Sequence, residues 1–310
     1  MRRIVGLIVI NLILIILLGI FTPYFLTKAN LIVMVDNIAL EIVILSGYAL
    51  LIIGGHFDLS VDGVVALTGV IAGLLMNKGL GWVWSCGIAI SVSALLGLIN
   101  GFTVAKLGIN GFIATLTTWW ICQGFSFGLT KATAPYGFPD AFGILGQSHI
   151  FGFKSFVLYA IIIALVLSFV LHKTQMGIHL YASGDSPKSC ERVGIDVAML
   201  GIKIYILLGI LAGFVGLILA SRLDAASPIA VDGVALRVIA ALVIGGCSLN
   251  GGQGTIIGGI LGLVMMHILS NAVIQIGMSP YWQKAMLGSI LLTAVLSERL
   301  NFNFRRLRNV

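Results

Sequence analysis

The amino-acid sequence predicts an all-α fold, a polytopic transmembrane helical bundle of about ten spans. Composition is the first reason. Of the 310 residues, 59% are hydrophobic and only 9% are charged, whereas a soluble domain carries about 25% charged residues. So few charges do not suffice to cover a water-facing surface. The second reason is that apolar stretches close to the roughly 20 residues of a membrane-spanning helix recur along the chain. We therefore treat residues 1–310 as one transmembrane domain.

Ten apolar stretches are candidate spans. The first resembles a signal peptide, but its apolar run of about 18 residues is longer than a signal-peptide core and no A-x-A-like cleavage site follows, so we expect an uncleaved span. Glycines and scattered charges blur the ends of the second, third and eighth stretches. The ten stretches cover residues 4–22, 34–53, 59–76, 82–105, 112–130, 153–172, 201–221, 233–249, 255–276 and 283–298.

Lysine and arginine predict the orientation, because cytoplasmic loops carry an excess of both. With the N-terminus inside, 11 of the 18 lie on the cytoplasmic side and 7 outside, so we expect N-in and C-in, in agreement with an even number of spans. The inside group is Arg2, Arg3, Lys106, Lys173, Lys188, Arg192, Lys203, Arg299, Arg305, Arg306 and Arg308. The outside group is Lys28, Lys78, Lys131, Lys154, Arg222, Arg237 and Lys284.

A long polar interruption, residues 173–200, then lies in the cytoplasm. Pro187 suits the first turn of a short helix that Asp185 or Ser186 would cap, and Gly194 would end that helix. An ordinary surface loop is the alternative, but the order of cap, helix and glycine favours a short amphipathic helix on which a soluble partner docks. The docking residues are expected to be Gly184, Asp185, Ser186, Pro187, Lys188, Ser189, Glu191, Arg192 and Gly194.

Few ionisable groups fall within the spans. Glu41 is an acid inside a span, which by default suggests function, although it also lies only about 8 Å beyond Asp36, close to the outer interface. Asp58 or Ser60 is expected to cap the following helix; the alternative is that this helix start lines a permeation path. Because other ionisable groups are scarce in the spans, we expect a neutral solute and no coupling to an ion gradient.

A glycine-dense tract, VIGGCSLNGGQGTIIGGILG (243–262), is expected to serve close helix packing or to line a path. It lacks the GxxxxGK[ST] pattern and a preceding strand, so it does not indicate a nucleotide site. Asn271 would hydrogen-bond either a polar solute or a neighbouring helix. The residues expected to line the path are Glu41, Asp58, Ser60, Thr115, Thr118 and Asn271.

Other function classes are disfavoured. The net charge of +7 comes from basic residues at span ends, which favours anionic lipid and not nucleic acid as the partner. The four cysteines lie far apart and indicate neither a disulfide framework nor a metal site. No Ser-His-Asp, HExxH or paired-carboxylate arrangement suggests an enzyme, and we expect this chain to bind no cofactor.

At this point the motifs identify a resemblance. From about residue 23 to 300 the chain resembles the permease subunits of ATP-binding-cassette importers for ribose and related simple sugars, a family related to autoinducer-2 permeases and, more distantly, to branched-chain amino acid permeases. Two matching segments, GGHFDLSVDG (54–63) and ATLTT (114–118), are weakly specific. Two others are specific: YASGDSPKSCERVGI (181–195) and IAALVIGGCSLNGGQGTIIGGILG (239–262), the latter followed by Asn271.

The resemblance implies a transport subunit in the bacterial cytoplasmic (inner) membrane that passes a small neutral solute, such as a monosaccharide, into the cytoplasm by alternating access. It implies a second permease subunit, two cytoplasmic ATPase subunits that bind ATP and Mg²⁺, and an extracytoplasmic solute-binding protein. The segment 181–195 would be the coupling helix that docks on the ATPase.

Two departures from the family pattern concern solute and partner choice. His56 and Asp62 stand where the family usually has glycine, which bears on the lining of the path and leaves ribose itself open. Ser189, Cys190 and Glu191 replace an Ala-Ala-Arg run, which would fit a heterodimer of two permeases. Autoinducer-2, a nucleoside and an amino acid are alternative solutes. An ion-coupled secondary carrier and a non-transporting membrane scaffold or receptor are the alternatives from other classes.

Overall fold

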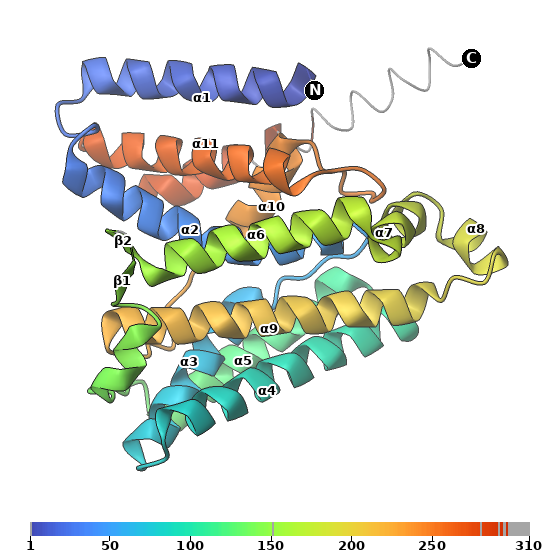
Figure 1. Ribbon diagram of the computed structural model, residues 1–310, viewed down its shortest axis with the longest axis horizontal. Coiled ribbons are helices and arrows are strands. Elements are labelled where there is room, and N and C mark those ends of the chain that lie inside the picture. Colours follow the sequence, from blue (N-terminus) through green and yellow to red (C-terminus); the bar gives the residue numbers. More distant parts are fainter. Residues whose placement is uncertain (1, 151, 280, 291, 294–295, 297–310) are drawn as a thin grey trace.

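The computed structural model describes residues 2–150, 152–279, 281–290, 292–293 and 296. The long helices run roughly parallel and form one bundle (Figure 1). They are α1 (Arg2–Phe21), α2 (Lys28–Ile53), α3 (Val61–Asn77), α4 (Trp82–Gly101), α5 (Gly111–Thr130), α6 (Ser155–Lys173), α9 (Val197–Leu223), α10 (Val234–Gly245) and α11 (Ile256–Gln275). The shorter elements are the π-helix η1 (Phe102–Lys106), the 3-10 helix η2 (Asp140–Ile144), β1 (His149–Ile150), β2 (Phe153–Lys154), α7 (Gln175–Asp185) and α8 (Pro187–Arg192).

The all-α transmembrane class is confirmed. Within the described part of the chain, six helices are long and apolar enough to cross a membrane. They are Arg3–Phe21, Lys28–Ile53, Trp82–Lys106, Ser155–Lys173, Val197–Leu223 and Ile256–Gln275. The predicted span 283–298 falls partly outside the described residues; residues 281–290 are helical. The basic residues predicted at 299–308 also lie outside the described residues.

The predicted span 233–249 is wrong in length. Helix α10 has 12 residues, which makes it about 18 Å long. Gly233 (φ +76°) precedes it and Gly246 (φ +103°) ends it, so a left-handed residue interrupts the helical backbone at each end. Residues 224–233, before α10, form turns and irregular structure in place of another helical turn.

Helix α9 occupies the centre of the bundle and packs against α2, α3 and α4. Its contact with α4 depends on glycine: a Cβ at Gly101 would lie 2.8 Å from the Cα of Ile202. Small residues at such positions let two helix backbones approach closely. The buried core therefore includes much of α9. The exposed side chains of α1, α4, α5 and α6 are largely apolar.

A non-helical segment, residues 54–60, joins α2 to α3 inside this core. The phenol of Tyr48 donates to the Asp58 carbonyl oxygen at 2.7 Å, and the phenol of Tyr205 donates to the Phe57 carbonyl oxygen at 2.7 Å. Both tyrosines are fully buried. Non-helical backbone at membrane depth needs such partners, because no water or lipid group satisfies its carbonyls.

The two ends of the bundle differ. The N-terminus, α7 and α8 lie at one end, and the β1–β2 hairpin lies at the opposite end (Figure 1). Arg3 Nη2 donates to the Val243 carbonyl oxygen at 2.9 Å, which brings the C-terminal part of α10 to the same end as the N-terminus. We call these the α8 end and the hairpin end.

The polar segment 173–200 contains two helices, α7 and α8, and the first residues of α9, in place of the single short helix expected. Pro187 occupies the first position of α8 with Ser186 before it, as predicted. Ser186 bonds the Ser189 hydroxyl at 2.7 Å and not a backbone N–H, so it does not cap through its side chain. Gly194 has φ +86° and follows the helix, as predicted for a terminating glycine.

Candidate functional site

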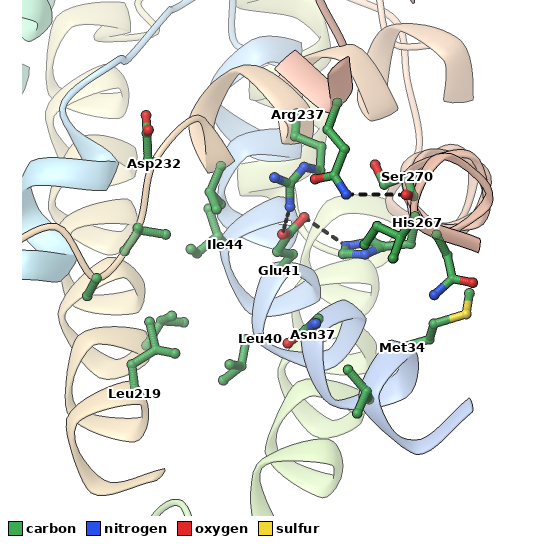
Figure 2. Close-up of a pocket in the computed structure, with 18 residues that line it drawn as sticks. Met34, Asn37, Leu40, Glu41, Ile44, Leu219, Asp232, Arg237, His267 and Ser270 are labelled. Atoms are coloured by element: carbon green, nitrogen blue, oxygen red, sulfur yellow. Dashed lines mark hydrogen bonds and ion pairs between the residues drawn. The ribbon is translucent and has the colours of Figure 1, made fainter. Parts of the chain in front are cut away.

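A cavity of about 380 Å³ lies between α2, α9, α10 and α11 (Figure 2). Pockets for small molecules have volumes of roughly 300–1,000 Å³, with apolar walls and a few polar groups. Leu40, Ile44 and Leu219 are among the apolar lining residues. The polar lining residues are Asn37, Glu41, Asp232, Arg237, His267, Ser270, Asn271 and Gln283.

Three ionisable side chains converge in this cavity from three helices, Glu41 from α2, Arg237 from α10 and His267 from α11 (Figure 2). Arg237 Nη1 donates to Glu41 Oε1, and His267 Nε2 lies 3.1 Å from Glu41 Oε2. Glu41 is 6% exposed and His267 8%. A carboxylate buried to this extent requires cationic or hydrogen-bonding neighbours. Glu41 is therefore placed in the polar wall of the cavity and is not a solvated interfacial residue.

The sequence reasoning missed two members of this group. Arg237 was assigned to the external charges, although it lies inside the predicted span 233–249, and His267 was not singled out within 255–276. An ionisable residue inside a predicted span is by default a functional candidate, so that signal was available for both. The expectation that ionisable groups other than Glu41 are scarce in the spans is wrong at these positions.

The hairpin end of the cavity has a charged rim. Asp232 pairs with Lys284 at 2.6 Å, and both side chains are largely exposed. At the same end but outside the cavity lining, Lys154 Nζ lies 2.9 Å from Asp36 Oδ2, and Arg222 Nη1 donates to Oδ1 of the lining residue Asn37 at 3.3 Å. The cavity thus has its solvent-accessible charges at the hairpin end.

Asn271 lines the cavity and also joins two helices. Its Nδ2 donates to Asn30 Oδ1 at 2.7 Å, and Asn30 Nδ2 donates to Asn271 Oδ1 at 3.1 Å. The helix-to-helix contact expected as one alternative is therefore present. A contact with solute stays a prediction.

The four remaining path residues lie elsewhere. Asp58, Ser60, Thr115 and Thr118 are all buried and none lines the cavity. They belong to a hydrogen-bonded network centred on Asn100, which the sequence reasoning did not single out. Asn100 Nδ2 donates to Ser60 Oγ at 2.8 Å, and the Thr118 hydroxyl donates to Asn100 Oδ1 at 2.6 Å.

The same network fixes the backbone before α3. Thr115 Oγ1 accepts from the Leu59 N–H at 2.8 Å, and Asp58 Oδ1 accepts from the Ser60 N–H at 2.5 Å. Ser60 occupies the N-cap position of α3, but its side chain does not cap the helix. The predicted cap is thus right in position and wrong in its hydrogen bond. These side chains hydrogen-bond residues 58–60 to α4 and α5.

Asp62, one of the departures from the family pattern, holds the start of α10. Its Oδ2 accepts from the Gly233 N–H at 2.8 Å and its Oδ1 accepts from the Ala235 N–H at 2.9 Å. The first N–H groups of a helix lack partners within the helix, and a carboxylate there also suits the helix dipole. Asp62 on α3 therefore caps α10 from outside and sets the position of Arg237, two residues after Ala235.

At the α8 end, glycine backbones pack closely against one another. The Gly252 N–H donates to the Ile53 carbonyl oxygen at 2.9 Å. A Cβ at Gly251 would lie 2.8 Å from the Cα of Gly184 and 2.9 Å from that of Gly55. These contacts leave no room for side chains where α2, α7 and the loop after α10 meet.

Tyr181 adds a link between α7 and this loop, because its hydroxyl donates to the Gly254 carbonyl oxygen at 2.7 Å. Burial, and secondarily the Cys247 thiol, raises the pKa of the Tyr181 phenol. The phenol therefore remains a protonated donor at neutral pH.

The predicted docking residues divide into two groups. Helix α8 lies beyond the end of the bundle (Figure 1), and Pro187, Lys188, Ser189, Glu191 and Arg192 are exposed on it. Asp185 at the end of α7 and Gly194 after α8 are also exposed. Ser186 is half-buried. Gly184 is buried against Gly251 and lies away from that exposed surface. Among the described residues, no cluster of three or more His, Cys, Asp or Glu residues has an arrangement that would hold a metal ion.

An apolar bundle with a polar cavity toward one end and a charged helix projecting from the other is the arrangement of a membrane transport subunit. The family described as the permease component of branched-chain amino acid transport systems matches residues 30–295. The chain belongs to this family of permeases.

Similar curated proteins include sugar permeases. The chain is 32% identical to the ribose import permease protein RbsC of Escherichia coli over 289 residues, which cover 92% of this chain and 90% of RbsC. It is 31% identical to the L-arabinose transport system permease protein AraH of Escherichia coli over 301 residues, 97% and 92% of the two chains. It is 35% identical to the probable ABC transporter permease protein y4mJ of Sinorhizobium fredii over 256 residues, 82% and 77%. No solved structure matches this chain.

Proposed function

We propose that this chain is the membrane permease subunit of an ATP-binding-cassette importer for a small sugar. Its relatives of similar length are named as ribose and L-arabinose permeases. The cavity supports the proposal, because its volume and its mixture of apolar walls and hydrogen-bonding groups suit a monosaccharide. In this account the cavity is the part of the path that receives solute, and the glycine contacts at the α8 end keep the path closed toward the cytoplasm.

We place the N-terminus, the C-terminus and α8 in the cytoplasm and count ten spans in the bacterial inner membrane. The ten are α1 to α6, α9, α10 together with residues 224–233 before it, α11 and the predicted last span, 283–298, which the structure describes in part. Lysine and arginine bias supports this orientation. The hairpin end, with the charged rim, then faces the extracytoplasmic side, where a solute-binding protein delivers the sugar.

The observation that carries the coupling part of the proposal is a continuous set of contacts from α8 to the cavity. The exposed helix α8 follows α7 directly, and α7 contacts the glycine loop through Tyr181 and Gly184. That loop joins α10 to α11, which carry Arg237 and His267. Cytoplasmic ATPase subunits that bind ATP and Mg²⁺ would move α8. The path would then open to the extracytoplasmic side and to the cytoplasm in turn. A second permease subunit, identical or different, completes the complex.

One observation favours a second candidate, an ion-coupled carrier. The buried contact between Glu41 and His267 is a pair of titratable groups of the kind found in proton-coupled transporters. The experiment is uptake of radiolabelled D-ribose, L-arabinose or D-allose into cells that express the complete importer. ATP-dependent uptake that persists after an ionophore collapses the Na⁺ and H⁺ gradients, at constant ATP, supports the importer. Loss of uptake under those conditions supports the carrier, and no uptake of any of the three sugars contradicts the proposed solute class.

A further inference from the structure

We propose that Glu41, Arg237 and His267 form a sugar-binding site within the permease itself, one that recognises the adjacent hydroxyl groups of a neutral sugar. We call these three residues the cavity triad. The inference rests on the proposed function, because it assumes that the solute is a sugar that passes through the cavity.

Three buried polar atoms of the triad lack a full set of hydrogen-bond partners. Arg237 Nε has no partner among the described residues. Glu41 Oε2 and His267 Nε2 have only each other, 3.1 Å apart. A buried polar group without a partner is unfavourable. Such groups on the wall of a cavity indicate that something else completes their hydrogen bonds.

The chemistry of those atoms suits a sugar. The triad offers an acceptor on the carboxylate beside a donor on the guanidinium and a ring nitrogen on the imidazole. A sugar hydroxyl both donates and accepts, so two adjacent hydroxyls match an acceptor placed beside a donor. Hydrogen bonds that involve a charged partner are roughly twice as strong as neutral ones.

The charges around the cavity are balanced. Glu41 is paired with Arg237, and Asp232 at the rim is paired with Lys284. Each carboxylate that lines the cavity thus has its own cation, so the pairs add no net charge to attract an anion. A neutral, hydroxyl-rich solute satisfies the open hydrogen bonds without breaking either ion pair.

The triad is held in position by three helices. Its members come from α2, α10 and α11, and α10 is held by the Asp62 cap. Asn37, Ser270 and Asn271 add amide and hydroxyl groups to the cavity lining, while Leu40 and Ile44 offer apolar surface for the C–H face of a sugar ring. The permease would therefore select its solute in addition to any selection by the binding protein.

The test is sugar binding to the purified full-length permease in lipid nanodiscs, without its partner subunits, measured by saturation-transfer difference NMR. The probes are D-ribose, L-arabinose and D-allose, with D-glucuronate as an anionic comparison. We expect at least one neutral sugar to bind, and D-glucuronate to bind more weakly. In the double variant Glu41→Gln/Arg237→Gln, which removes both charges together, the dissociation constant should rise about tenfold or more, since hydrogen bonds to charged groups are lost.

Lys154→Gln is the matched control, because Lys154 forms an ion pair with Asp36 at the same end and does not line the cavity. It should leave the dissociation constant unchanged. If the double variant does not fold, His267→Asn decides, since it leaves the ion pair intact and should still weaken binding severalfold.

Three results would overturn the inference: no binding of any neutral sugar to the wild-type permease, unchanged binding in a folded triad variant, or tighter binding of D-glucuronate than of every neutral sugar. None of these results would by itself contradict ATP-driven sugar import, which is measured on the complete importer. The two proposals can therefore fail separately.

Discussion

The carboxylate of Asp62 on α3 accepts a hydrogen bond from the backbone N–H of Ala235 on α10, at 2.9 Å. This contact fixes a 12-residue helix that begins inside the bundle, and it places Arg237 one half-turn further along, beside Glu41. The geometry of the cavity therefore depends on a residue that does not line it.

Asp62→Ala should lower the melting temperature of the purified permease, because two backbone N–H groups at the start of α10 lose their acceptors. Loss of a helix cap costs about 1–2 kcal/mol. Asp62→Asn, which keeps one acceptor oxygen, should cost less. The measurement is a thermal melt that follows exposure of the buried cysteines, Cys122, Cys190 and Cys247, with a thiol-reactive dye. Asp140→Ala, an exposed acid in the first turn of η2, is the control and should leave the melting temperature unchanged. Equal melting temperatures for Asp62→Ala and wild type would show that the cap is dispensable.

Gly184→Ala should disturb the closed end of the path. A Cβ there would overlap the Ile53 carbonyl oxygen and the Gly252 nitrogen, both backbone atoms. Overpacking of this kind costs about 1–3 kcal/mol, and we expect a lower melting temperature together with reduced sugar uptake. Gly128→Ala in α5, where an added Cβ meets nothing within 4 Å, is the matched control. The account of the closed end fails if the two variants behave alike.

The Glu41–Arg237 ion pair should show strong coupling in a double-mutant cycle. Glu41→Gln alone leaves Arg237 without its carboxylate partner, and Arg237→Gln alone leaves Glu41 with only His267. Removing one partner of a buried pair costs roughly 3–5 kcal/mol, whereas replacing both costs much less. The double variant should thus melt at a higher temperature than at least one of the single variants. The pair Asp36–Lys154, in which Lys154 is 27% exposed, should couple more weakly. Additive effects in the Glu41–Arg237 cycle would contradict a buried ion pair.

Local patterns in the sequence predicted the elements that depend on neighbouring residues. Pro187 and Gly194 bound α8 because proline suits a first helical turn and glycine suits the left-handed conformation after the last. The all-α membrane class followed from composition, which requires no knowledge of packing.

The cavity was only partly predictable, because its members meet through tertiary packing. Glu41 and Asn271 were predicted as path residues, and both line the cavity. Arg237 and His267 lie far along the chain from Glu41, and no local spacing joins them. Asp58 and Thr118 carry polar groups equally suited to a path or to a buried network. The network could not be predicted because both residues meet through Asn100, which lies on another helix.

The short length of α10 was missed for a similar reason. Hydropathy over residues 233–249 does not distinguish a full span from a half-length helix that begins at a left-handed glycine. Its start is stabilised by Asp62, which is more than 170 residues distant in sequence, so the preceding sequence alone did not reveal the boundary.

The central claim is that partner ATPase subunits drive this permease through α8. The most direct measurement is sugar-stimulated ATPase activity of the complete importer in proteoliposomes, with binding protein and sugar present. Glu191→Ala together with Arg192→Ala should leave membrane insertion normal and abolish the stimulation, because both side chains are exposed on α8. The control is Lys131→Ala together with Asp140→Ala, exposed charges outside α8 at which we expect normal stimulation. Stimulation at the wild-type level in the Glu191 and Arg192 double variant would contradict the claim.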